Sequence, residues 1–449
     1  MNKRQNTLAK EFNGAQLLRF ALPTMIMMVF MGLYTIVDTI FVSHFVNTDA
    51  LASINIVCPV INLTVGLGTM LATGGNAVIA RNMGEGQEQT AKDNFTLLFM
   101  VGLVIGTAIM AGGLIWLDNI LRLLGASDRL FPYAKAYLGT LLLFIPANIL
   151  QTLFASLFVT AGKPGLGSAL SICAGILNII LDFVFIALCH MGIRGAALGT
   201  GIGYLTPAAV GLIYFTVHRR GALYFCKPKW NGSMVLESCL NGSSEMVGQL
   251  ATVITTLLFN RTMIKLMGED GVAAVTILLY AQFLLSTLHI GFSMGVAPVI
   301  GYNYGSGDRQ KLKAILGICL RFILISSPAV FLACLVGGTA LVGLFAELGS
   351  AVYHIAAQGF RIFSFSFLFC GVNIFTSAMF TALSNGKVSA VLSFLRTFIF
   401  LTSGILLLPK LLGVTGIWVA VPAAEGLACC LSVRCLCREY RRLSLNPAE

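Results

Sequence analysis

Long apolar stretches, separated by short polar connections, follow one another along the whole chain. Each stretch is long enough for the about 20 residues of helix that cross a bilayer. Because they are apolar all round, periodicity does not define their ends, and glycine, proline and polar turns set the boundaries. The predicted spans are residues 15–44, 51–80, 95–117, 133–160, 166–190, 193–217, 240–265, 272–301, 314–346, 351–381, 387–409 and 413–434. The pattern predicts an all-α integral membrane protein with twelve transmembrane helices.

One polar turn occurs twice. Residues 78–92 read VIARNMGEGQEQTAK and residues 299–313 read VIGYNYGSGDRQKLK, so both contain V-I-x-x-N-x-G-x-G-x5-K. The offset is 221 residues, and the same offset aligns Gly192 with Gly413. A constant offset without gaps indicates a duplicated unit of roughly two hundred residues whose copies run in the same direction. We therefore predict two six-helix lobes related by an internal parallel repeat.

Polar segments divide the chain into five parts. The predicted parts are a cytoplasmic N-terminus at 1–14, an N-lobe at 15–217, a cytoplasmic linker at 218–235, a C-lobe at 236–437 and a cytoplasmic tail at 438–449. The apolar run after the polar N-terminus is longer than the roughly 7 to 15 residues of a signal-peptide core. No cleavable signal is therefore expected.

Composition agrees with a membrane environment. Hydrophobic residues make up 57% of the chain, charged residues 10%, and the mean hydropathy is +0.88, whereas about a quarter of the residues in a soluble domain are charged. The net charge is +11, and basic residues gather before the first span and in residues 219–229, 309–313 and 438–442. These are alternate connections, so the positive-inside rule predicts a multi-pass protein of the inner (plasma) membrane with both termini cytoplasmic. No basic face with interleaved aromatic residues stands apart, which excludes nucleic acid as an expected partner.

Motifs for ATP, metal or serine-nucleophile chemistry are absent from the sequence. It contains no G-x4-G-K-[ST], no H-E-x-x-H and no G-x-S-x-G. The twelve cysteines are scattered, and the four near the C-terminus lack the spacing of a zinc site. We expect no enzymatic activity, no metal site and no cofactor, and we favour a secondary transporter driven by an ion gradient. A channel or a membrane receptor without coupled transport is the alternative from another class.

Ionisable side chains are rare inside the spans. Asp38 lies late in the first span and Asp182 in the middle of the fifth, with Asn178 one turn before it on the same helix face. An ionised Asp at the bilayer centre costs about 2.5 to 3.5 kcal/mol on insertion scales, so chance occurrence is discouraged. At about 1.5 Å per residue, both acids reach the outer half of the membrane, at depths that allow them to meet and to bind a proton. A structural polar contact between helices is the alternative.

The second half lacks these acids. The offset places Phe259, Ile399 and Ser403 at the positions equivalent to 38, 178 and 182. The two halves therefore share a pattern but differ in chemistry, and coupling is predicted in the N-lobe.

The charged residues of the second half have two interpretations each. Glu245, near the start of span seven, is either an acid of the first helical turn, favoured by the dipole, or a group that lines the transport path. Glu425 in the last span is left open in the same way. The basic residues are interpreted as snorkelling cations or as partners within the lobe; they are Arg321, Arg361 and Arg396.

Together, these features resemble the multidrug and toxic compound extrusion (MATE) family. The shared features are the duplicated twelve-span plan, the paired N-x-G-x-G turns, V-D-x2-F-V at 37–42, N-x3-D at 178–182 and G-A-A-x-G-T at 195–200. The resemblance covers nearly the whole chain. It implies two six-helix lobes arranged in a V. It also implies antiport, in which organic cations or other amphipathic toxins leave the cytoplasm as protons or sodium ions enter.

The resemblance also implies a set of site residues. The ion site of the N-lobe corresponds to Asp38, Tyr137, Asn178, Asp182 and Thr200, and the proline that bends the first helix in some members corresponds to Pro23. Another branch of the family has a sodium site in the second lobe, with a mid-helix Glu in span seven and an Asp in span ten. Here span ten contains no Asp, and Glu245 lies earlier than that Glu. This departure favours the bacterial, DinF-like branch with its ion site in the N-lobe, and it leaves proton or sodium open.

The substrate cavity is predicted from weaker signals. Met27 and Met31 give the first span a repackable side, and the chain has 31 Phe residues, which suits a promiscuous apolar cavity. The alternative interpretation is that these Met and Phe side chains face the lipid and line no cavity. Glu245, Gln249 and Gln282 are polar candidates for the wall. The expected partners are cationic or amphipathic small molecules and the bilayer, and the chain is expected to be a monomer. Within transport, a flippase for lipid-linked sugars is the alternative.

Overall fold

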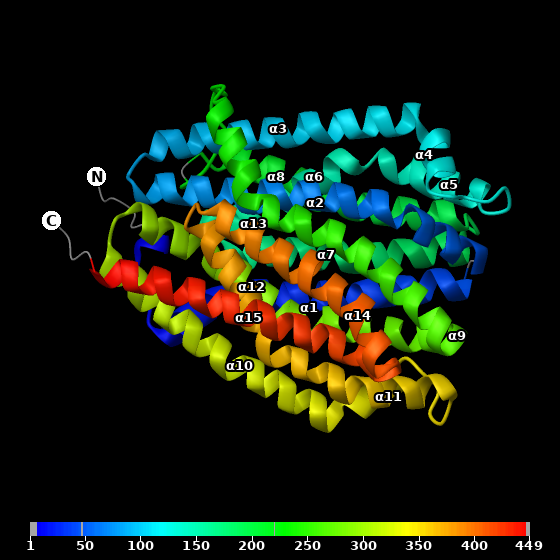
Figure 1. Cartoon of the computed structure of the whole chain (residues 1–449). Coiled ribbons are helices and arrows are strands. Elements are labelled where there is room, and N and C mark those ends of the chain that lie inside the picture. Colours follow the sequence, from blue (N-terminus) through cyan, green and yellow to red (C-terminus); the bar gives the residue numbers. More distant parts are fainter. Residues whose placement is uncertain (1–6, 46–47, 220, 446–449) are drawn as a thin grey trace.

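The computed structural model is a bundle of long helices that run side by side (Figure 1). It describes residues 7–45, 48–219 and 221–445, without the side chains of residues 36, 38–45, 48, 51 and 445. The first half contains α1 (Gly14–Phe45), α2 (Thr48–Gly84), α3 (Glu88–Ile115), α4 (Leu117–Leu123), α5 (Phe131–Leu142), α6 (Ile145–Thr160), α7 (Pro164–Asp182) and α8 (Ile193–Val217). The second half contains α9 (Gly232–Gly305), α10 (Arg309–Gly343), α11 (Ala351–Phe363), α12 (Phe367–Ala382), α13 (Gly386–Phe394), α14 (Thr402–Leu412) and α15 (Val414–Leu445). Short 3₁₀ or π-helical segments lie at Thr7–Ala9, Phe183–Leu188, Ser364–Ser366 and Leu395–Leu401.

The helices account for the predicted number of spans. Within the described residues, ten segments are long and apolar enough to cross a membrane, and the pair α5 and α6, bent by 52°, makes another. α9 is one of these ten segments, although it has 74 residues. At about 1.5 Å per residue, it is more than three times as long as the roughly 30 Å hydrocarbon core is thick. Its backbone is not helical at Gly268 (φ 69°, ψ −152°), so α9 consists of two spans that meet there. The described part of the chain therefore forms twelve spans.

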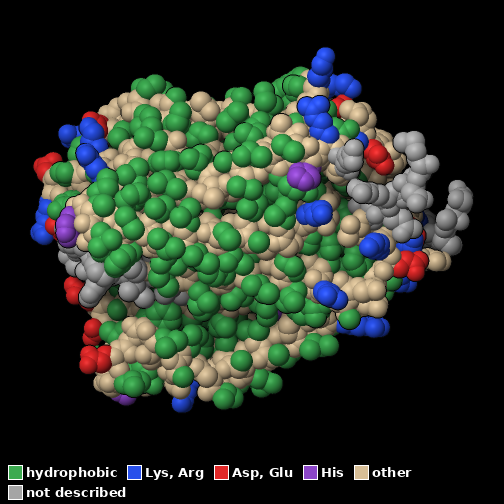
Figure 2. All heavy atoms as spheres, turned by 180° about the vertical axis from the view of Figure 1, so that it is seen from behind, with side chains coloured by type: hydrophobic (Ala, Val, Ile, Leu, Met, Phe, Trp, Pro, Cys, Tyr) green, Lys and Arg blue, Asp and Glu red, His purple; other side chains and the backbone are tan. Residues whose placement is uncertain are grey.

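The surface is that of a multi-pass membrane protein. Hydrophobic side chains cover the middle of the bundle, and charged side chains gather toward its two ends (Figure 2). Large apolar side chains such as Val104, Ile325 and Val336 are more than half exposed. A contiguous apolar belt of this kind is stable in contact with lipid and not with water. α1 begins and α15 ends at the same end of the bundle (Figure 1).

The backbone repeats with the offset found in the sequence. Gly86 and Gly307 follow α2 and α9 with positive φ angles of 76° and 74°. Gly192 and Gly413 adopt nearly the same conformation, with φ 57° and 59° and ψ −138° in both. Glycine adopts such angles at little cost because it has no Cβ. Each half contains an even number of spans and starts at the same end of the bundle, so the repeat is parallel, as predicted.

The halves meet along α1, α2 and α9, where small residues let the backbones approach closely. A Cβ at Gly74 would overlap the carbonyl oxygen of Ser238, and a Cβ at Gly242 would overlap that of Met70. An ion pair lies nearby, at the end of the bundle that holds the start of α1. Arg81 Nη1 and Nη2 donate to the two carboxylate oxygens of Glu237 at 2.7 and 3.2 Å. This pair joins the last turn of α2 to the first turns of α9.

The helix ends differ slightly from the predicted boundaries. α9 begins at Gly232, before the predicted start of the C-lobe at 236, because Asn231 caps it: its Oδ1 accepts a hydrogen bond from the Met234 amide at 3.1 Å. α15 continues to Leu445, past the predicted start of the tail at 438. The division into lobes, linker and tails otherwise stays a prediction.

The connection between the halves is bound to α3. The Cys226 amide donates to Thr96 Oγ1 at 3.1 Å, and Lys229 Nζ lies 2.9 Å from an Asp93 carboxylate oxygen. The ring of Phe225 packs 5.0 Å from that of Phe95. Residues 225–229 of the linker, which we call the strap, are therefore docked on α3 of the first half. The polar sequence of the linker did not indicate these contacts.

Candidate functional site

The predicted ion-site residues of spans five and six form one buried cluster. Asp182, Asn178 and Thr200 are at most 7% exposed, and they lie on the neighbouring helices α7 and α8. Asn178 Nδ2 donates to Thr200 Oγ1 at 3.4 Å, and that hydroxyl donates to the Ala196 carbonyl at 3.0 Å. A carboxylate, an amide oxygen and a hydroxyl are the oxygen ligands that suit a proton or a hard cation. The sequence spacing predicted the shared helix face, and the structure confirms it.

Two glycines of α8 make room for this cluster. A Cβ at Gly199 would overlap a carboxylate oxygen of Asp182, and a Cβ at Gly203 would lie 3.4 Å from Asn178 Cβ. Gly199 is the last glycine of the G-A-A-x-G-T motif, so the motif holds both the Thr200 hydroxyl and the space that Asp182 occupies. Sequence reasoning noted the motif and missed the role of Gly199.

The end of α7 has irregular geometry next to the acid. Asp182 is the last residue of α7, and the π-helical segment Phe183–Leu188 follows it directly. Segments of π-helix are rare and frequently lie at functional sites, because they re-aim the side chains around them. The equivalent helix of the second half also contains a π-helical segment, at Leu395–Leu401.

Asp38 and Tyr137 complete the predicted set. Asp38 lies in α1, but its side chain is outside the described residues, so its meeting with Asp182 stays a prediction. Tyr137 is buried on α5, and α5 packs against α8, the helix that contains Thr200. α1 itself packs against α7.

Pro23 lies inside α1, which continues past it as one helix. The proline leaves a backbone carbonyl without its usual partner and weakens the helix at that point. α9 packs against this part of α1, since a Cβ at Gly291 would lie 2.7 Å from Met25 Cα and a Cβ at Gly295 would lie 2.9 Å from Ala21 Cα. The weak point of α1 is therefore at the contact between the halves.

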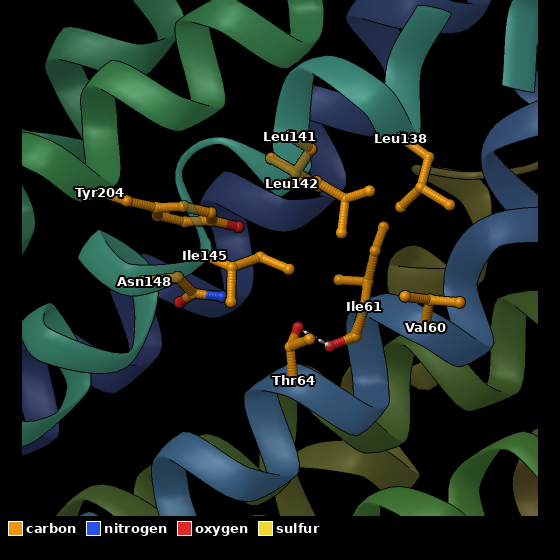
Figure 3. A pocket seen from close by; sticks show the side chains of 9 residues that line it. All are labelled: Val60, Ile61, Thr64, Leu138, Leu141, Leu142, Ile145, Asn148 and Tyr204. Atoms are coloured by element: carbon orange, nitrogen blue, oxygen red, sulfur yellow. Dashed lines mark hydrogen bonds between the residues drawn. The ribbon is translucent and has the colours of Figure 1, made fainter. Parts of the chain in front are cut away.

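A small cavity lies in the interior of the first half (Figure 3). Its volume of ≈ 10 Å³ is about the space that one water molecule needs. The lining residues come from α2, α5, α6 and α8; they are Val60, Ile61, Thr64, Leu138, Leu141, Leu142, Ile145, Asn148 and Tyr204. Tyr204 lies one turn beyond Thr200, and Leu138 directly follows Tyr137. The sequence analysis did not identify Thr64, Asn148 and Tyr204 as lining residues. The available signal was that each is a polar side chain within an apolar span.

A larger pocket of ≈ 420 Å³ lies at the end of the bundle where α2 and α9 finish. It adjoins the ion pair between the halves. Its lining residues are Arg81, Glu85, Asn303, Tyr304, Gly305, Gly307, Arg309, Leu312 and Leu443.

The predicted substrate residues do not line either of these two pockets. Met27 is buried, and Met31, Glu245, Gln249 and Gln282 are partly buried. Gln249 lies at the contact between the halves, because a Cβ at Gly66 of α2 would be 3.2 Å from its Cβ. A shared cavity for these residues stays a prediction.

Arg396 is a partner within its own half. Its Nε and Nη2 donate to Glu425 Oε1 at 2.9 and 2.7 Å. Glu425 is therefore the acid of an internal ion pair, a role that neither of its two interpretations included. Among the described residues, no group of three or more His, Cys, Asp or Glu side chains could hold a metal ion.

Comparisons with known proteins agree with this geometry. A family model described as MatE matches residues 23–184 and 246–404. The chain is 24% identical over 447 residues to the multidrug export protein MepA of Staphylococcus saprophyticus, covering 96% of this chain and 95% of that protein. MepA of Staphylococcus aureus is also 24% identical, over 441 residues, with the same coverage.

Solved structures share the fold. One is described as the outward-facing conformation of a multidrug resistance MATE family transporter of the MOP superfamily, with a TM-score of 0.92, 22% identity and coverage of 99% of this chain and 100% of that one. Another, MATE in complex with MaL6, has a TM-score of 0.93 and 21% identity with the same coverage.

Proposed function

The chain belongs to the MatE family, and on that premise we propose that it is a secondary active multidrug efflux transporter, which exchanges cationic or amphipathic molecules for inward protons or sodium ions. The relatives named as multidrug export proteins cover almost the whole chain. These names disfavour the two alternatives, a flippase for lipid-linked sugars and an uncoupled channel or receptor.

The buried cluster of Asp182, Asn178 and Thr200 is the main support for coupling in the first half. A carboxylate in the interior of a membrane protein is costly, so its presence marks an ion path or a proton relay more often than a structural contact. Gly199 lacks the Cβ that would overlap the Asp182 carboxylate. In the second half, the offset of 221 places Ser403 at the position equivalent to Asp182. The cluster is therefore a feature of one half and not of the repeated scaffold.

Coupling follows from a difference in ion affinity between two conformations. An ion shifts the inward and outward populations only if it binds one of them more tightly. With both carboxylates charged, Asp38 and Asp182 favour the conformation that admits outside water or holds a cationic substrate, and protonation removes that preference. α1 is the proposed moving part, because it contains Asp38, the weak point at Pro23 and the contact with α9.

The remaining features complete the proposal. The protein lies in the inner (plasma) membrane with both termini in the cytoplasm, in agreement with the basic connections at the end of the bundle where α1 begins. It acts as a monomer, without a cofactor and without enzymatic activity. The coupling ion belongs to the N-lobe, as in the DinF-like branch.

Reconstitution into liposomes tests the proposal. The protein is expected to move tetraphenylphosphonium, a permanently charged organic cation, only when a pH gradient or a sodium gradient is imposed. Comparing the two gradients identifies the ion. Movement of the cation at the same rate without either gradient would show a channel instead.

A further inference from the structure

Exposed arginines continue the lipid-facing side of α15 toward the end of that helix. Leu427 is 55% exposed, and Arg434 and Arg438 are also exposed. At about 100° per residue, all three side chains lie within about 20° of one direction around the helix. The side of α15 that places an apolar side chain in the hydrocarbon therefore carries arginines about two and three turns further on.

α10 has a similar arginine on its lipid-facing side. Arg321 is exposed, and Leu324 and Ile325, one turn further along, are 62% and 72% exposed. One turn in the other direction, a Cβ at Gly317 would meet no atom within 4 Å. Long side chains on a helix point back toward its N-terminus. The open space at Gly317 therefore lets Arg321 extend toward the end of the bundle where α10 begins.

The two helices bring these arginines to the same depth. α10 begins where α15 ends (Figure 1), and Lys313 joins them there: its Nζ donates to Ser444 Oγ at 2.9 Å and lies 5.0 Å from the centroid of the Tyr440 ring. Arg321 lies eight residues after Lys313. Arg434 lies six residues before Tyr440 and ten before Ser444. At about 1.5 Å per residue, both arginines are about 12 Å further along the bundle than the Lys313 contact.

Arg321 and Arg434 also lie on the same side of the helix pair. Around each helix, the arginine is about 80° to 100° from the direction of the Lys313 contact. Because the two helices run in opposite directions, these rotations turn both side chains toward the same side. Cys319 of α10 and Ser432 of α15, which are 0% and 2% exposed, lie on the opposite side. The arginines therefore face out of the bundle.

The acids nearest in sequence do not pair with these arginines. Glu439 lies 3.6 Å from Arg442, and Asp308 lies 3.5 Å from Lys311. In the part of the chain that the structure describes, the three outward-facing arginines have no ion-pair partner. They differ in this from Arg396, whose partner Glu425 is within the same half.

The internal repeat shows that the scaffold does not require these charges. The offset of 221 relates the three arginine positions to apolar side chains of the first half, which also face outward. They are Met100, Ile213 and Val217, which are 41%, 62% and 68% exposed. An apolar side chain is the ordinary choice at such a position in lipid, so the arginines are a feature of the second half alone.

An unpaired arginine beside the hydrocarbon requires an anion from outside the chain. A charged side chain in the hydrocarbon is costly, and a long one extends its head to the headgroup layer. There the guanidinium forms paired hydrogen bonds with phosphate oxygens. Several basic residues at one site add a preference for lipids with net negative charge. A soluble acidic protein does not reach side chains that face lipid.

We propose that Arg321, Arg434 and Arg438 form a binding site for the headgroup of an anionic phospholipid, whose acyl chains lie along the exposed side of α10 and α15. In the proposed orientation, this lipid belongs to the cytoplasmic leaflet. The inference goes beyond the proposed transport function and depends on the membrane location alone.

Native mass spectrometry of the purified protein tests the proposal. The protein is equilibrated in detergent with equal amounts of phosphatidylglycerol and phosphatidylcholine, which carry the same acyl chains and differ in headgroup charge. We expect bound lipid to favour phosphatidylglycerol by about fivefold, the factor that one additional arginine contact supplies. This preference is expected to decrease as the salt concentration rises. In the site variant Arg321→Gln, Arg434→Gln, Arg438→Gln, the ratio is expected to be about one.

A matched control removes the same charge elsewhere at this end of the bundle. Lys10→Gln, Arg219→Gln, Lys227→Gln changes three exposed positions and is expected to keep the preference. Equal loss in the control and the site variant would show a general attraction to positive charge and overturn the proposal. A preference that survives in the site variant would overturn it as well. So would displacement of phosphatidylglycerol by an equal concentration of inorganic phosphate, since the site would then bind a free anion.

A single substitution keeps the test decisive if the triple site variant does not fold. Arg438→Gln changes one exposed residue in the last turns of α15, where substitutions usually leave stability nearly unchanged. Its ratio of bound phosphatidylglycerol to phosphatidylcholine is expected to fall to about half of the unmodified value, and an unchanged ratio would contradict the proposal. No step of this test requires transport, so failure of the proposed antiport would be seen separately in the liposome experiment.

Discussion

Gly84 and Gly305 occupy equivalent positions in the two repeats and lie against each other's helix where α2 and α9 cross. A Cβ at Gly84 would overlap the carbonyl oxygen of Tyr302, and a Cβ at Gly305 would overlap that of Arg81. The offset of 221 relates both the glycines and the carbonyls, so the crossing is symmetric between the halves. The Arg81–Glu237 pair breaks the symmetry, because the residue equivalent to Glu237 is Gln16 and that equivalent to Arg81 is Tyr302.

This crossing seals one end of the boundary between the halves. In a transporter that alternates its access, the backbones must separate here when the protein opens at the end that holds the start of α1. Close backbone packing and the Arg81–Glu237 ion pair are among the contacts that opening must break.

Adding a methyl group at the crossing is expected to weaken the seal. Gly84→Ala and Gly305→Ala force the two backbones apart, at a typical cost of about 1 to 3 kcal/mol for overpacking. The matched control is Gly248→Ala in α9, where a Cβ would meet nothing within 4 Å, and where alanine favours a helix by roughly 0.5 to 1 kcal/mol. Thermal unfolding and labelling of a cysteine introduced beside the crossing measure the effect. Equal stability of Gly84→Ala and Gly248→Ala would contradict it.

Loss of the Arg81–Glu237 pair is expected to have a smaller effect. Both side chains are partly exposed, at 23% and 35%, so the coupling energy is expected to be about 0.2 to 1 kcal/mol and to decrease with salt. A double-mutant cycle with Arg81→Ala and Glu237→Ala isolates it. The measured quantity is the fraction of protein open at the sealed end, from distances between spin labels. If the two substitutions act additively at low salt, the pair does not contribute to the seal.

Neutralising the acids of the first half is expected to stop coupled transport. Asp182→Asn and Asp38→Asn keep the size of the side chain and remove the charge, so efflux driven by the ion gradient falls to the background level while the protein remains folded. In the double variant, the affinity for tetraphenylphosphonium no longer decreases as the pH falls between about 8 and 5, the range in which perturbed carboxyl groups titrate. Ser403→Ala, at the exposed position equivalent to 182, is the control and is expected to transport normally. Gradient-driven efflux from either Asn variant would assign that acid a structural role.

The docked linker makes a prediction about thiol chemistry. Burial raises the pKa of the Cys226 thiol above its ordinary value of 9.0; the Thr96 hydroxyl opposes this shift and the Asp93 carboxylate adds to it. The folded state thus favours the protonated thiol, a stabilisation that is present below pH 9 and is lost as the pH rises through the raised pKa. Because the thiolate is the nucleophile, iodoacetamide at pH 7.5 is expected to modify Cys226 more slowly than the exposed Cys437.

Release of the strap is the corresponding test. Asp93→Ala removes the partner of both Cys226 and Lys229, and the rate of Cys226 modification is expected to rise by about threefold to tenfold as local opening becomes easier. Asp118→Ala, which breaks the exposed pair with Lys135 elsewhere, should leave the rate unchanged. A Cys226 rate as fast as that of Cys437 in the unmodified protein would show that the strap is not docked in solution.

The sequence by itself determined that the protein lies in a membrane, how many spans it has and that it contains a repeat. A bilayer demands about 20 apolar residues per helix, so composition and turns were sufficient to locate twelve spans. A constant offset of 221 was sufficient to predict a parallel duplication, and the helical spacing of Asn178 and Asp182 was sufficient to place both on one face. These are local properties, or comparisons of the chain with itself.

The tertiary structure decided which side chains meet across helices. A helix that is apolar all round has no polar face to mark its outer side, so the sequence does not reveal its rotation or its neighbours. The space that Gly199 leaves for Asp182, the pairing of Arg396 with Glu425 and the crossing of Gly84 with Gly305 all depend on that rotation and on the distance between helices. The docked strap at Cys226 depends on contacts between segments 130 residues apart, whereas local polarity alone indicated a plain linker.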